Sequence, residues 1–166
     1  MRYTHLCLVA LLAVASAQAE EPGKPKSSIL LCTELCFDAR QGDRSLRRES
    51  RPTVVTADQA EAVVVIEDNP AEQGFRQQLK VQPHLDGDRI QLNLNAQVSQ
   101  GQQACLQQSL QASVTPGSPV VCEIESPQSG QKLRVVVTPW VIGPQQRFQG
   151  IDKNTGKPIL VEFVNR

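Results

Sequence analysis

The stretch LKVQPHLDGDRIQLNLNAQV, residues 79–98, predicts a β-hairpin. Apolar and polar residues alternate in both halves, and Asp86-Gly87 separates them. Asp-Gly favours a tight primed turn because these residue types tolerate the positive φ angles that such a turn needs. Clean alternation on both arms means that one face is buried and the other meets water. We therefore expect residues 79–85 and 90–98 to pair as antiparallel strands.

The same period of two continues on both sides of this hairpin. In residues 29–37 the apolar side chains share one face of a strand, whereas Cys32, Glu34 and Cys36 share the other. No stretch shows a convincing helical period. The predicted fold class is all-β and mainly antiparallel, as a meander of hairpins or a sandwich. Further strands are expected over residues 53–56, 60–66, 110–114, 120–124, 133–142, 148–151 and 159–164.

Three stretches interrupt this pattern. Residues 39–49 (ARQGDRSLRRE) are charged and typical of a turn, and residues 67–74 (EDNPAEQG) indicate a loop. Residues 99–108 are rich in Gln and predict a loop or a short helix. Pro139 predicts the end of a strand or a bulge, because proline has no N–H to donate to a neighbouring strand.

The first 19 residues have the features of a secretory signal peptide. Arg2 is followed by a short apolar run at 6–15 and by an A-x-A cleavage signal at 17–19. The run is too short for a permanent anchor, and no second apolar run of spanning length follows. We expect cleavage after Ala19, a flexible leader over 20–28, and no transmembrane helix in the mature protein. The expected location is the periplasm, in solution or associated with the outer membrane.

Cys32, Cys36, Cys105 and Cys122 remain after cleavage. In an oxidising compartment four cysteines predict two disulfides. A zinc site is less favoured, since the C-x3-C pair has no second tight pair. Residues four apart on a strand lie roughly 13 Å apart, and the Cα atoms of a disulfide lie within about 7 Å. We therefore expect Cys32 and Cys36 not to bond each other, and the other two connectivities stay open.

Composition and motifs favour a protein without catalytic chemistry. The formal net charge is zero, which gives no general attraction to nucleic acid. His84 is the one histidine beyond the signal peptide, and its place beside the Asp86-Gly87 turn predicts a surface position rather than a Ser-His-Asp triad. We expect no enzyme activity, no cofactor and no metal ion.

Two features are candidate contacts for a partner. Arg44, Arg47, Arg48 and Arg51 form a basic patch, which is either a solvated loop or a site for an anionic partner such as a lipopolysaccharide phosphate or an acidic protein. Trp140 follows Thr138-Pro139 on an expected strand. Its expected state is partial burial, and an exposed ring would anchor a partner.

Four segments, taken in order, resemble the β-domain of bacterial secretins, the ring-forming outer-membrane channels of type II and type III secretion and of type IV pili. The resemblance implies a secretin-like β domain over 29–142, followed by a hairpin extension over 143–166. The segments are residues 50–66 (SRPTVVTADQAEAVVVI), 74–94 (GFRQQLKVQPHLDGDRIQLNL), 110–124 (LQASVTPGSPVVCEI) and 133–142 (LRVVVTPWVI).

The chain departs from the secretin pattern in three ways. A short leader stands where secretins carry ring-building domains, the segment at 67–74 is much shorter than a secretin gate, and SPQSGQK at 126–132 replaces the Pro-x-Leu-Gly repeat. We therefore expect no channel activity.

The resemblance implies an accessory or interaction module of a secretion or pilus system. Its expected partner is an envelope protein, either a secretin or a second copy of the chain, paired through sheet edges. The alternative is an independent periplasmic β-sandwich that binds a ligand in a deep apolar pocket.

Overall fold

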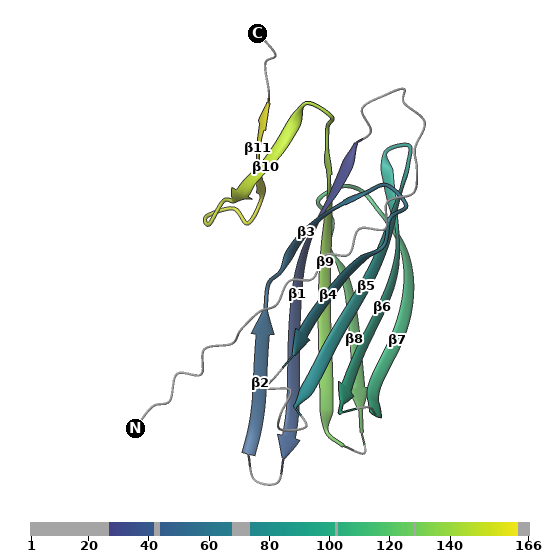
Figure 1. Ribbon diagram of the computed structural model, residues 1–166, viewed down its shortest axis with the longest axis vertical. Helices are drawn as coiled ribbons and strands as arrows, with labels where there is room; N and C mark the ends of the chain where they lie inside the picture. Colours follow the sequence, from purple (N-terminus) through teal and green to yellow (C-terminus); the bar gives the residue numbers. More distant parts are fainter. Residues whose placement is uncertain (1–26, 42–43, 68–73, 102, 128, 163–166) are drawn as a thin grey trace.

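The computed structural model describes residues 27–41, 44–67, 74–101, 103–127 and 129–162. The expected signal peptide and nearly all of the expected leader lie outside these residues. Every regular element of the described chain is a β-strand, and all pairings are antiparallel (Figure 1). The predicted all-β, mainly antiparallel fold class is thus confirmed. The described part holds no helix with the length and apolar character needed to cross a membrane.

The first sheet has the order β2-β1-β9-β8, and β3 also pairs with β1. Both β2 and β3 keep one register against β1, with Ser50 opposite Leu35 and Thr53 opposite Cys32. Between them the backbone N–H and the hydroxyl of Thr33 both donate to the carbonyl of Pro52, at 3.0 and 2.8 Å. The strands are β1 (Ser28–Gln41), β2 (Arg44–Ser50), β3 (Thr53–Ala57), β8 (Val120–Ser126) and β9 (Gln131–Ile142).

The second sheet has the order β4-β5-β6-β7. Its centre is the hairpin predicted from residues 79–98, in which Leu85 pairs with Ile90 and Asp86 with Arg89. Gly87 has the positive φ of +62° that the tight turn requires. The predicted pairing of the two arms is therefore confirmed, and the two residues between them are Gly87 and Asp88 instead of Asp86 and Gly87. The strands are β4 (Ala62–Glu67), β5 (Phe75–Asp86), β6 (Arg89–Gln100) and β7 (Gln103–Val114).

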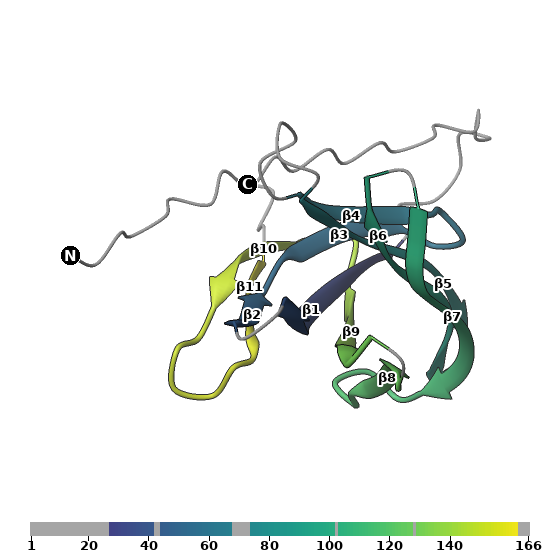
Figure 2. The same cartoon turned by 90° about the horizontal axis from the view of Figure 1, so that it is seen from below.

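The two sheets pack face to face around one core (Figure 2). The chain changes sheet at two corners, between β3 and β4 and between β7 and β8. From β1 to β9 the strands follow one another in an up-and-down order, and β9 then pairs with β1, with Ile142 opposite Ser28. The core is mainly aliphatic, and one aromatic pair, Phe37 and Phe75, has ring centroids 4.9 Å apart.

Two stretches that were expected to be irregular are strands. Residues 39–41 belong to β1 and residues 44–49 to β2, whereas 42–43 lie outside the described residues. Asp38 faces Arg47 across the ladder, so opposite charges support the pairing on a solvated face. Residues 99–108 belong largely to β6 and β7, whose ladder contains a register shift between Val98 and Ser99. Polar side chains fit β7 because only its core-facing side needs apolar residues.

Pro139 neither ends β9 nor causes a bulge in it. Its carbonyl accepts the N–H of Gly117 at 2.7 Å. The N–H and C=O of one strand residue point to the same side, so the missing N–H of Pro139 also lies on the side of β8. The pairing of β8 begins two residues away, with Val120 opposite Val137, so no ladder bond is lost there.

The last two strands form a separate two-stranded sheet beyond the end of β9 (Figure 1). They are β10 (Gln146–Ile151) and β11 (Pro158–Glu162), joined by a turn over 152–157 as the sequence predicts. Their register shifts between Phe148 and Gly150. This hairpin lies outside the sandwich core.

The hydroxyl of Thr33 gives a direct test of the link between β2 and β3. Thr33→Val keeps the side-chain volume and removes the 2.8 Å bond to Pro52. We expect it to lower the free energy of unfolding by about 1 kcal/mol. Thr138→Val, on the outer face of β9, is the matched control and should change it by less than about 0.5 kcal/mol. Urea unfolding measures both, and equal effects would contradict the role given to Thr33.

Candidate functional site

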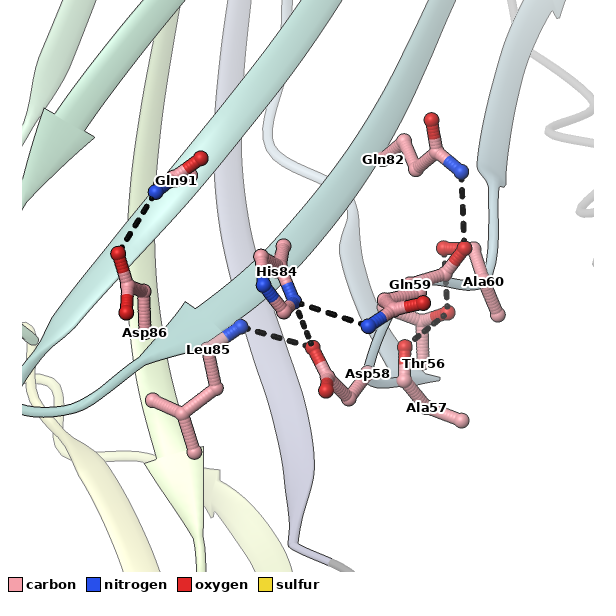
Figure 3. A network of polar contacts seen from close by, with 10 residues as sticks. All are labelled: Thr56, Ala57, Asp58, Gln59, Ala60, Gln82, His84, Leu85, Asp86 and Gln91. Atoms are coloured by element: carbon pink, nitrogen blue, oxygen red, sulfur yellow. Dashed lines mark hydrogen bonds and ion pairs between the residues drawn. The ribbon is translucent and has the colours of Figure 1, made fainter.

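The corner between β3 and β4 carries a polar network (Figure 3). Asp58 Oδ1 accepts the N–H of Leu85 at 2.7 Å and lies 3.3 Å from Nδ1 of His84. Nε2 of Gln59 lies 3.2 Å from the same ring nitrogen, and the backbone N–H of Gln59 donates to Pro83 at 2.8 Å. Gln59 has a positive φ of 64°, a costly conformation for a residue with a side chain. The network thus fixes the corner to β5.

This arrangement does not form a catalytic triad. The nearby hydroxyl, that of Thr56, donates to the carbonyl of Ala60 at 3.2 Å and not to His84. Nδ1 of His84 can donate to Asp58 or accept from Gln59, but one tautomer cannot do both. The His84 side chain is 44% exposed, consistent with the predicted surface position. The described residues contain no group of three potential metal ligands.

Trp140 packs at the second corner, which lies between β7 and β8. Its ring lies against Gly117, and a Cβ atom placed on this glycine would be 2.7 Å from Cη2 of the indole. Gly117 has a φ of +83°, so both conformation and space require glycine. Trp140 is half-buried, as the sequence predicts, and one ring face is occupied by the turn of its own chain. The contact between Gly117 and Trp140 joins residues far apart in the sequence, so the local sequence does not reveal it.

The four arginines do not form one patch. Arg47 and Arg51 lie on the outer face of the first sheet, whereas the strand alternation places Arg48 on the opposite face. Arg47 bonds Glu49 at 2.7 Å, and Arg51 lies 3.7 Å from Glu34. Arg44 is opposite Gln41 in the backbone register. A hollow of about 290 Å³ on this face is therefore lined by charges of both signs.

All four cysteines are free in the structure. Cys32 and Cys36 lie on the outer face of β1, whereas Cys122 faces the core and is 5% exposed. Burial raises the pKa of the Cys122 thiol and also that of Cys32, where a hydrogen bond from Thr53 opposes the shift. Both open connectivities need Cys122 to join Cys32 or Cys36 across the sheet, and the two disulfides stay a prediction.

A hollow on the outer face of the second sheet measures about 470 Å³. Sequence reasoning missed it, because the sequence shows only that polar residues alternate with apolar ones in these strands. Pairing of the strands gathers the side-chain amides on one face. We call the following residues the amide surface: Gln78, Gln82, Asn93, Asn95, Gln97, Gln107 and Gln111.

No family model, curated protein or solved structure matches this chain. The likeness to secretins therefore rests on the four sequence segments alone.

Gly117→Ala tests the second corner. Its Cβ collides with Trp140 and the backbone keeps a positive φ, so we expect a loss of about 2–3 kcal/mol in unfolding free energy. Gly130→Ala is the matched control, because Gly130 has a similar φ of +63° with nothing within 4 Å of the added Cβ, and should cost about 1 kcal/mol. In a Trp140→Leu background the cost of Gly117→Ala should fall. Equal costs at both glycines would show that the ring contact has no effect.

Burial predicts different thiol reactivities. In reduced, folded protein at pH 8, iodoacetamide should modify Cys122 more slowly than Cys105, because burial restricts access to Cys122 and raises its pKa. In urea the two rates should become similar. Mass spectrometry of peptides from timed samples measures both. Equally rapid modification of the folded protein would mean that β8 does not hold Cys122 in the core.

Proposed function

We propose that this chain is a non-catalytic, exported envelope protein that acts as a secretin-like interaction module. The hairpin β10–β11 carries this proposal. Five large apolar side chains of the described residues are exposed, and three of them, Ile151, Ile159 and Val161, belong to this hairpin. Ile159 and Val161 share one face of β11, whereas Ile151, opposite Pro158, lies on the other face. Exposed apolar neighbours outside the core are typical of a surface that contacts another protein.

The hairpin is well formed although it is small. Asp152 accepts the N–H of Asn154 at 2.8 Å and the hydroxyl of Thr155 at 2.9 Å, and these bonds lower the pKa of its carboxyl group. Gly156 closes the turn with a bond to the carbonyl of Asp152 at 2.8 Å. An isolated two-stranded sheet is marginally stable in water. A partner strand added at an open edge would therefore stabilise a turn and register that already exist.

The hollows favour surface recognition over ligand binding in the interior. A ligand-binding sandwich needs a deep apolar pocket with a few polar groups. The hollows of about 470 and 290 Å³ instead lie on outer faces and are lined mostly by polar side chains. Between the sheets, aliphatic side chains such as Leu79 and Val98 are completely buried.

The kind of partner is proposed from the sequence. The four secretin-like segments fall on β3 and β4, on β5 and β6, on β7 and β8, and on β9. The order of the four segments in the sequence, which is the order found in secretins, supports a partner in a secretion or pilus assembly, either a secretin or another envelope protein that offers an extended strand.

Site-specific photo-crosslinking in cells tests the proposal. A photoreactive residue at Val161, which is 41% exposed, should give a discrete adduct with an envelope protein. Val121 on β8 is the matched control, with the same side chain and 47% exposure, and should give none. Ile159→Lys should abolish the adduct at 161 without lowering the melting temperature of the sandwich. Identical adducts from both positions, or none from 161, would overturn the assignment.

A further inference from the structure

The amide surface forms a regular grid across three strands. Gln78 is opposite Gln97 and Gln82 is opposite Asn93 in the ladder of β5 and β6. In the next ladder, Gln97 is opposite Gln107 and Asn93 is opposite Gln111. Neutral amides therefore stand side by side on both sides of β6.

This face differs in charge from the outer face of the first sheet. There, Lys132 and Arg134 lie 3.4 and 3.2 Å from Glu123, and other ion pairs follow along β1 and β2. The lining of the amide surface contains one ion pair, Lys80 with Glu61 at 3.8 Å. Lys80 lies on β5 between Gln78 and Gln82, opposite Asn95. A solvated face usually mixes charges of both signs along its length, as the first sheet does. The rest of the lining of the amide surface is uncharged.

Strand propensity does not explain the asparagines of the amide surface. Asn is depleted in strands, yet Asn93 and Asn95 occupy the middle of the central strand β6. Thr at these positions would suit both the strand and the solvent. Residues that oppose the local structural preference are expected where a function requires them.

The chemistry of the surface specifies a neutral ligand rich in hydroxyl groups. Each side-chain amide offers two N–H donors and one carbonyl acceptor, and each hydroxyl of a sugar both donates and accepts. Asn95 donates to Ser109 at 2.9 Å within the face. Among the described residues, the amides of Gln78, Gln97 and Gln107 make no side-chain hydrogen bond within the protein, so they are available. An anionic ligand would match the N–H donors and leave the carbonyl acceptors without a donor, and an apolar ligand would leave both unmatched.

We infer that the amide surface binds a neutral glycan chain across β5, β6 and β7. Its hollow of about 470 Å³ falls in the size range of small-ligand sites. No aromatic side chain lines it, so binding depends on many hydrogen bonds and not on stacking. This site is separate from the hairpin β10–β11, and either assignment stands without the other.

NMR titration of the ¹⁵N-labelled mature protein tests the inference. The probes are chitotetraose and maltotetraose, two neutral oligosaccharides, with a heparin tetrasaccharide as the anionic control. At millimolar concentration a neutral probe should shift the side-chain NH₂ signals of Asn93, Asn95 and Gln97 in a saturable way. No shift with either neutral probe, or equal shifts with heparin, would overturn the inference. Shifts that depend on protein concentration alone would assign the face to a second copy of the chain instead.

Two neighbouring glutamines supply a matched pair of variants. Gln107 lines the hollow, whereas Gln108 is exposed on the opposite face of β7. Gln107→Thr should weaken glycan binding roughly 2–10-fold, the loss of about one hydrogen bond. Gln108→Thr should leave binding unchanged. Equal effects on binding would show that the face contributes nothing specific.

The double variant Asn93→Thr with Asn95→Thr separates binding from folding. It should lose binding while its midpoint of urea unfolding stays equal or rises, because Thr suits a strand better than Asn. A lower midpoint together with retained binding would show that the two asparagines serve the fold and not a ligand.

Discussion

The antiparallel ladder between β1 and β9 is the interaction on which the rest of the structure depends. It joins Ser28 to Ile142 and continues to Asp38 opposite Lys132, so strands far apart in sequence become neighbours. All other neighbours are consecutive or nearly so, and without this ladder the meander has no closure. It also holds the first sheet together, because β1 carries β2 and β3 on its other side. Contacts of this sequence separation carry the largest loop-closure entropy, which slows folding.

Closure of the meander requires the chain to leave one sheet and enter the other twice, and both corners use the same device. The N–H of Gln59 donates to Pro83, and the N–H of Gly117 donates to Pro139. On β5, the pairing with β4 begins at Val81, two residues before Pro83. On β9, the pairing with β8 begins at Val137, two residues before Pro139. A proline supplies a carbonyl to the corner and has no N–H to leave unpaired. The side chains of Asp58 and His84 support the corner between β3 and β4, whereas the indole ring of Trp140 supports the corner between β7 and β8.

The sequence predicts well the features that depend on local alternation. The hairpin at 79–98, the all-β class and the turn over 152–157 follow from the period of two and from turn residues. It fails for β2 and the first part of β7, since strands whose solvated face is strongly polar lose the apolar signal that marks a strand. The position of Trp140 on Gly117 and the amide surface both depend on which strands are neighbours. That information is not local, because side chains from β5, β6 and β7 meet only after the sheet has formed.

Because Ser28 pairs with Ile142, the strands of the sandwich follow one another around a closed ring, and the start of β1 lies beside the end of β9. Since these two strand ends are neighbours, the same fold is compatible with chain termini placed at another loop. A circular permutant that joins residue 142 to residue 28 and opens the chain between Asp86 and Gly87 would keep every ladder of both sheets. In such a protein the most local hairpin would become the most distant contact, and the order in which the strands assemble would be inverted while the final packing stayed the same.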